Sequence, residues 1–165
     1  RTDFNSMMNA RLFAIAAYII VIMIGGFLLA GIVLNPFMTI ETRGSSLYGI
    51  FQPLMNSKAA WIYLVLMSFN LAMSIIPVCY LAAAVAILKP DEYVAVGAGF
   101  FVFYLLFYFT GSLPWILSYS SLTSEPGRAS VGEVIYHVVF FTICSLAAAK
   151  CVKAVMQKRF LNGMD

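Results

Sequence analysis

Glu133 and His137 are the two residues whose types and spacing come closest to a chemical site. They lie four apart in SVGEVIYHVVFF (residues 130–141), so a helix places them on one face. His137 is the only histidine of the chain, and a carboxylate beside an imidazole could relay protons or bind a polar headgroup. The alternative is structural. Ser130 and Glu133 match a capping box at a helix start, and His137 would then be an ordinary packing residue of that helix.

Asn70 is the third candidate for this polar site. It follows Lys58 by about 18 Å of helix and so falls near the middle of an apolar segment. An unsatisfied amide at that depth is costly. We therefore expect Asn70 to hydrogen-bond another helix as structural glue or, alternatively, to contact a substrate or ion.

Known catalytic motifs are missing from the sequence, which has no Walker A loop, G-x-S-x-G, H-E-x-x-H or C-x-x-C. An intramembrane serine hydrolase would need His137 as its base, with the serines at positions 112, 118, 120 and 121 as candidate nucleophiles. Two possible ligands do not make a metal site, so we predict neither a metal nor another cofactor.

The composition is that of a membrane protein. Hydrophobic residues make up 62% of the 165 positions and charged residues 10%, whereas roughly a quarter of an average soluble domain is charged. The ten Lys and Arg residues are scattered or C-terminal and form no basic face, which argues against nucleic acid as a partner. The expected partners are membrane lipid and other integral membrane proteins.

Four apolar stretches reach the roughly 20 residues that a transmembrane helix needs. They are residues 12–34, 59–88, 93–114 and 131–152. The sequence therefore predicts an all-α polytopic membrane protein, a four-transmembrane-helix antiparallel bundle forming a single transmembrane domain over residues 1–165. A leader removed before Arg1 is left open.

Lys and Arg residues predict the orientation, because they are in excess on the cytoplasmic side of membrane proteins. Seven fall at the two termini and the second connection, against three on the other side (Arg43, Lys58 and Arg128). Both termini should therefore be cytoplasmic. The expected interfacial anchors are Trp61, Trp115, Lys150 and Lys153.

The third stretch breaks at residues 111–114, Gly-Ser-Leu-Pro. Counted from Tyr93, this break falls about 30 Å away, at the outer interface, where a helix would end beside Trp115. Residues 115–122 could instead continue the helix, lie flat on the membrane or re-enter it.

Two kinds of surface suggest contacts with other helices or other chains. Small residues allow close helix packing within the bundle or between subunits; they are Gly25, Gly26, Ala30, Gly31, Gly97 and Gly99. The outer loop 35–58 is unusually apolar and could lie on the membrane surface or bind a partner through Phe37, Leu47, Tyr48, Phe51 and Leu54.

Three functional hypotheses follow. The preferred one is a non-catalytic integral membrane subunit that packs within a larger membrane protein complex in a structural, accessory or assembly role. The first alternative is a small carrier, channel or lipid-binding protein with a polar site at Asn70, Glu133 and His137. The second is a membrane-embedded lipid-modifying enzyme. The scarcity of charge in the predicted spans argues against an ion-coupled pump.

Overall fold

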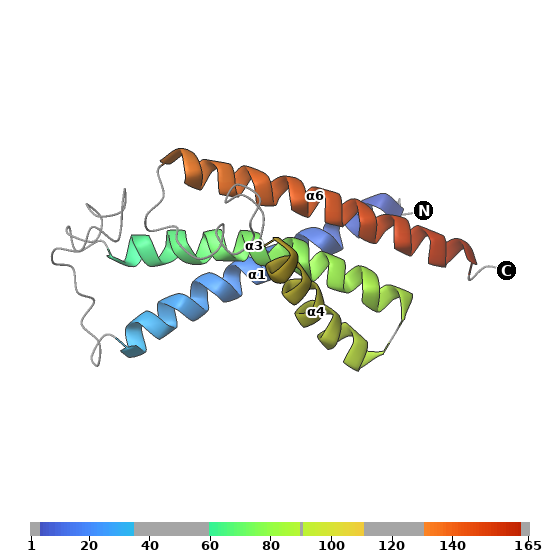
Figure 1. The fold of residues 1–165 in the computed structure, drawn as a ribbon, viewed down its shortest axis with the longest axis horizontal. Helices are drawn as coiled ribbons and strands as arrows, with labels where there is room; N and C mark the ends of the chain where they lie inside the picture. Colours follow the sequence, from blue (N-terminus) through green and yellow to red (C-terminus); the bar gives the residue numbers. More distant parts are fainter. Residues whose placement is uncertain (1–3, 35–59, 90, 111–130, 163–165) are drawn as a thin grey trace.

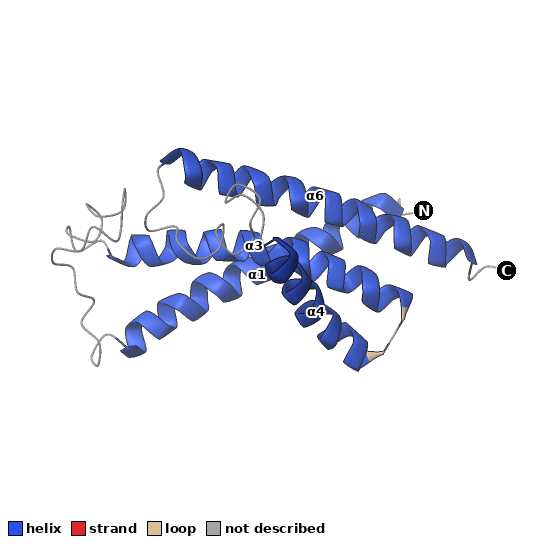
Figure 2. Cartoon of the chain, viewed as in Figure 1, coloured by secondary structure: helices blue, strands red, loops and turns tan. Residues whose placement is uncertain are grey.

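The described part of the chain is helical. The computed structural model describes residues 4–34, 60–89, 91–110 and 131–162, which contain helices and no strand (Figures 1 and 2). The helices are α1 (Phe4–Leu34), α3 (Ala60–Leu88), α4 (Glu92–Thr110) and α6 (Val131–Asn162). The all-α prediction is confirmed for these residues.

Three of the helices are long and apolar enough to cross a membrane. The candidate spans are Phe4–Val33, Trp61–Leu88 and Val134–Arg159. Helix α4 contains a shorter apolar segment, Val96–Phe109. Helices suit such apolar sequences because every backbone donor and acceptor is satisfied inside the segment when no water is available.

Two helices are longer than the apolar stretches predicted. Helix α1 begins at Phe4 rather than residue 12, and α6 continues to Asn162 rather than ending near residue 152. Both extensions mix polar and apolar residues and turn apolar side chains inward: Met8 on α1 is buried, and Val155 and Met156 on α6 are half-buried against the core. Core packing therefore continues into both of these extensions. Residues 111–114, with the predicted break, lie outside the described residues.

Helix α3 is the centre of the molecule. It packs against α1, α4 and α6, and α1 also touches α6 (Figure 1). Small buried residues allow this close approach; on α3 they are Ser68, Ala72, Ser74, Ala82 and Ala84. Pro77 lies inside α3, which continues beyond it to Leu88.

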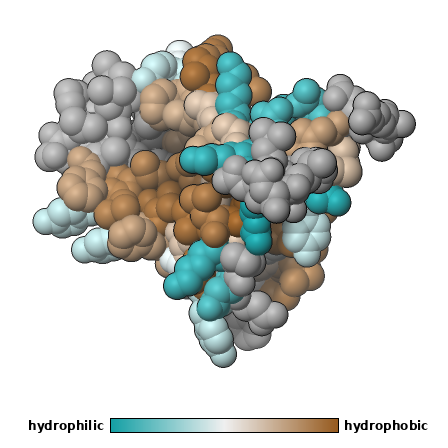
Figure 3. Space-filling view, turned by 90° about the vertical axis from the view of Figure 1, so that its right-hand side faces the viewer, coloured by the Kyte–Doolittle hydropathy of each residue, from teal (hydrophilic) through white to brown (hydrophobic). Residues whose placement is uncertain are grey.

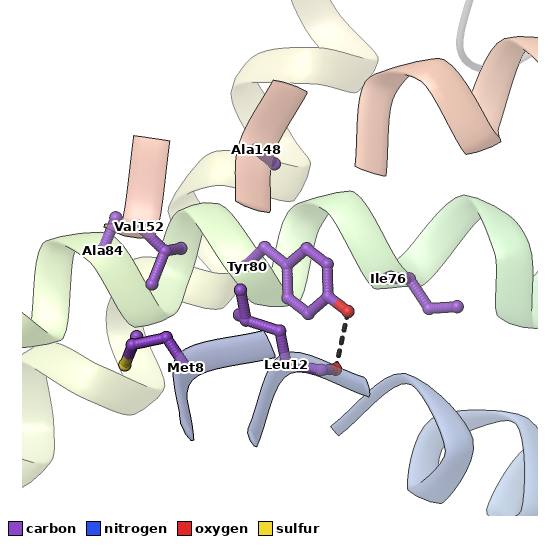
Figure 4. Packing of buried hydrophobic residues seen from close by; sticks show 7 residues of the cluster. All are labelled: Met8, Leu12, Ile76, Tyr80, Ala84, Ala148 and Val152. Atoms are coloured by element: carbon purple, nitrogen blue, oxygen red, sulfur yellow. Dashed lines mark hydrogen bonds between the residues drawn. The ribbon is translucent and has the colours of Figure 1, made fainter. Parts of the chain in front are cut away.

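The larger core cluster joins α1, α3 and α6 near their shared end. Its members are Met8 and Leu12 of α1, Ile76, Tyr80 and Ala84 of α3, and Ala148 and Val152 of α6 (Figure 4). The Tyr80 hydroxyl donates a hydrogen bond of 2.7 Å to the Leu12 carbonyl. This bond ties α1 to α3 inside an otherwise apolar contact.

A second cluster joins α3, α6 and α4. Val78 of α3 and Phe141 of α6 form its centre, and Val102 and Leu106 of α4 pack against it. Gly99 of α4 also faces α3, since a Cβ atom built there would lie 3.9 Å from the Cβ of Ala82. Helix α4 therefore reaches the bundle mainly through one apolar face.

The exterior is dominated by large apolar side chains. Figure 3 looks onto the end that carries the start of α1 and the end of α6, and it shows hydrophilic side chains set around a hydrophobic area. Exposed aromatic residues are frequent on α4, namely Tyr93, Phe100, Phe101, Phe103, Tyr104, Phe107, Tyr108 and Phe109. Such a surface fits lipid or another apolar protein surface rather than water.

Candidate functional site

Asn70 lies inside α3, about 15 Å along the helix from Ala60. Its side chain is 6% exposed, and its Oδ1 atom has no hydrogen-bond partner among the described residues. The neighbouring hydroxyls are used within α3: Ser68 donates to the Val65 carbonyl at 3.1 Å, and Ser74 to the Leu71 carbonyl at 2.7 Å. Asn70 is thus a buried polar group with acceptor capacity to spare.

His137 is the buried polar residue of α6, and it is 4% exposed. The Tyr136 ring lies beside it, with the two ring centroids 6.2 Å apart. One helical turn further, Phe141 is 1% exposed and packs with Val78 of α3. His137 therefore belongs to the face of α6 that is turned toward α3.

The helix register brings Asn70 and His137 to the same part of the α3–α6 contact. Asn70, Ser74 and Val78 are spaced by four on α3, and His137 and Phe141 are spaced by four on α6. The two helices run in the same direction in Figure 1, so one turn back from the Val78–Phe141 contact leads to Ser74 and His137. We call Asn70 and Ser74 of α3, together with His137 of α6, the polar ridge.

Glu133 is placed only by its backbone. It lies in the first turn of α6, four residues before His137, and its side chain is outside the described part of the structure, as is Ser130. The choice between a capping box and a Glu133–His137 pair therefore stays a prediction.

The predicted small-residue positions divide into two groups. A Cβ built on Gly31 would lie 3.0 Å from Cζ3 of Trp61 and 3.1 Å from Cδ1 of Leu64, so Gly31 packs closely against the start of α3. Gly99 faces Ala82, as described above. Gly25, Gly26 and Gly97 have no neighbouring atom within 4 Å of such a Cβ among the residues described, and Ala30 is exposed.

No protein-family model, curated protein or solved structure matches this chain. The residues themselves must therefore indicate the function.

The predicted anchors and loop residues are only partly described. Trp61 is exposed near Gly31, Lys150 is exposed, and Lys153 donates to Oδ1 of Asn9. Trp115 and the loop residues lie outside the described residues, and so do the candidate nucleophilic serines. The loop residues are Phe37, Leu47, Tyr48, Phe51 and Leu54.

Metal ligands do not cluster in the ranges that the structure describes. No group of three or more His, Cys, Asp or Glu side chains is found there that could hold a metal ion. Cys79 and Cys144 are half-buried thiols and Cys151 is an exposed one.

Two hydrogen bonds between α3 and other helices have no counterpart in the sequence analysis. The first is Tyr80 with Leu12, and the second is Arg159, whose guanidinium donates to the carbonyl of Ile87 near the end of α3. A tyrosine inside a long apolar run is a usable signal, because its hydroxyl needs a partner when buried. The Arg159 contact has no comparable signal in the sequence. It depends on where α3 and α6, two helices far apart along the chain, end next to each other.

Proposed function

We propose that this protein is a non-catalytic integral membrane subunit that packs against other membrane proteins within a larger complex. All four helices cross the membrane as an antiparallel bundle, and both termini are cytoplasmic. The single observation that carries the subunit role is the pair of exposed tyrosines in the second half of α4, Tyr104 and Tyr108.

Contacts between helix ends support the bundle arrangement. Gly31 at the end of α1 packs near the start of α3, and Leu12 near the start of α1 bonds to Tyr80 in the second half of α3. The 19 residues of α4 extend about 28 Å, close to the roughly 30 Å thickness of the hydrocarbon core. The seven-to-three distribution of Lys and Arg then favours cytoplasmic termini.

Tyr104 and Tyr108 lie on one exposed face of α4. They are 61% and 67% exposed, and their rings stack with centroids 5.9 Å apart. Tyr104 lies about 18 Å from the start of α4, well inside the hydrocarbon core in the proposed placement. Tyrosine prefers the membrane interface, because a hydroxyl in hydrocarbon lacks a partner and costs roughly 2–7 kcal/mol. Another protein that supplies hydrogen-bond acceptors at this depth removes that cost.

Helix α1 offers a second surface for such contacts. Gly25, Gly26 and Ala30 form a flat exposed patch with open space around the two glycines. In lipid, association between helices depends on close packing at small residues, which a flat patch permits. Tyr18, also exposed on α1, lies about 10 Å beyond Arg11 and adds a third hydroxyl within the proposed hydrocarbon core.

Co-purification tests the subunit role. The protein is tagged in its own membrane, extracted in a mild detergent, and its partner recovery is compared with that of the double variant Tyr104→Phe with Tyr108→Phe. At about 0.6–2 kcal/mol for each lost interhelical bond, we expect recovery to fall several-fold. Tyr93→Phe is the matched control, because Tyr93 is 89% exposed at the start of α4, where headgroup water satisfies its hydroxyl. Equal recovery with both variants would refute the role of the tyrosine face.

The polar ridge supports a second candidate function, a small carrier, channel or lipid-binding protein. The specific observation is the buried Asn70 Oδ1 atom, which has acceptor capacity unused by the described residues. In that case Asn70→Ala should abolish ligand binding or transport in reconstituted vesicles without lowering partner recovery. The subunit role predicts the reverse pattern for the tyrosine variants.

A further inference from the structure

Six cationic side chains gather at one end of the described bundle. They come from three helices or their ends and are Arg11, Lys89, Lys150, Lys153, Lys158 and Arg159. Two contacts bring these helix ends together: Lys153 of α6 donates to Asn9 of α1, and Arg159 of α6 donates to the carbonyl of Ile87 of α3. Figure 3 looks onto this end and shows its hydrophilic side chains around the apolar area. We call these six residues the basic end.

Asp91 is the carboxylate that the structure describes at the basic end. Asp91, which follows Lys89, accepts a hydrogen bond of 2.8 Å from the Tyr93 amide at the start of α4. Among the described residues, none of the six cations has an ion pair with a carboxylate. Five of the six are exposed, and Lys153 is half-buried. The described part of this end therefore presents five exposed positive charges.

The basic end lies at the depth of the lipid headgroups if the bundle spans the membrane as proposed. Lys150 follows Val131 by about 28 Å of helix, close to the thickness of the hydrocarbon core. The remaining residues of α6, to Asn162, add about 18 Å beyond it. Val152 in this part of α6 packs with Met8 of α1, and both are buried, so a packed core holds the cations in place.

We infer that the basic end binds the headgroups of anionic phospholipids. The inference rests on the proposed membrane placement, but it does not require a protein partner. Lys and Arg near a membrane surface attract anionic lipid, and the attraction is strongest within a Debye length of the headgroups. Lys150 and Lys153, three residues apart on one side of α6, can approach the same phosphate group. Nucleic acid is a poorer fit, because the surface next to these cations is apolar.

Lipid retention by the purified full-length chain tests the inference. The protein is freed of other chains, equilibrated with an equimolar mixture of phosphatidylcholine and phosphatidylglycerol in mild detergent, and its bound lipids are identified by native mass spectrometry. The wild-type protein should retain phosphatidylglycerol in several-fold excess. Added glycerophosphate should not displace that lipid, because the acyl chains contribute much of the binding.

The test variant is Lys150→Gln with Lys158→Gln, since these two exposed lysines leave the Lys153 and Arg159 contacts intact. Its preference for phosphatidylglycerol should fall at least threefold. The charge-conserving pair Lys150→Arg with Lys158→Arg should keep the preference, which separates lost charge from misfolding. Lys58→Gln with Arg128→Gln, on the connections assigned to the opposite side, is the matched control and should also keep it.

Two results would overturn the inference: lipid retained in proportion to the mixture, or an equal loss of preference in the control pair. Displacement of the lipid by glycerophosphate would also overturn it, because the site would then bind a soluble phosphate. None of these results bears on the subunit role, which is measured by partner recovery from the native membrane.

Discussion

Replacing Tyr80 with phenylalanine removes one hydroxyl and leaves the ring that fills the core. That hydroxyl is the donor of the 2.7 Å bond to the Leu12 carbonyl, and Tyr80 is buried. The carbonyl still accepts the amide four residues on within α1, so it is not left bare. Interhelical bonds in membrane proteins average about 0.6 kcal/mol and reach about 1.7, and hydrogen bonds in soluble proteins contribute about 1. We expect Tyr80→Phe to lower the free energy of unfolding by about 1 kcal/mol, a fivefold change in the equilibrium constant.

Reversible unfolding in mixed micelles measures this change. The purified chain is titrated with a denaturing detergent, and the loss of helix is followed by circular dichroism. Tyr93→Phe is the control, because that hydroxyl is exposed and its loss should leave the midpoint unchanged. If Tyr80→Phe unfolds at the same midpoint as the wild type, the buried bond contributes nothing to the stability of the fold.

The same titration checks three further predictions. Gly31→Ala should destabilise the fold by about 1 kcal/mol, since its methyl group would lie 3.0 Å from the ring of Trp61, whereas Gly25→Ala has open space and should be neutral. Phe141→Ala should cost at least about 2 kcal/mol because it opens a cavity between α3 and α6; a neutral result would place Phe141 outside the core. Asn70→Leu should raise stability by up to about 1 kcal/mol, because it removes a buried acceptor that has no partner among the described residues; a loss of stability would indicate a partner for that amide.

The helices were predictable from the sequence because long apolar runs leave the backbone few alternatives to helix. The start of α1 and the end of α6 were not, since polar residues interrupt the apolar pattern in FNSMMNAR (residues 4–11) and KAVMQKRFLN (residues 153–162). Phe4 and Met8 are four apart on α1, Val155 and Met156 continue the inward face of Val152 on α6, and all of them pack inward. A search for amphipathic periodicity beyond the apolar runs would have found both extensions.

The contacts of the candidate site were less predictable than its residues. Asn70 and His137 stand out as polar residues in apolar runs, and the structure buries both. Their position within about one helical turn of each other on α3 and α6 depends on helix register, which a single sequence does not encode in any local pattern. Similarly, the small residues of α1 predict a flat surface, but only the fold separates Gly31, which packs on Trp61, from the open Gly25 and Gly26.

Native mass spectrometry of the protein extracted from its own membrane in a mild detergent tests the subunit role most directly. We predict that the chain is recovered with distinct membrane protein partners at a constant ratio, and that this ratio falls in the double variant Tyr104→Phe with Tyr108→Phe. Recovery of the chain alone or as a homo-oligomer, carrying a defined small molecule or lipid lost in Asn70→Ala, would contradict the subunit role and favour the polar ridge as the functional site.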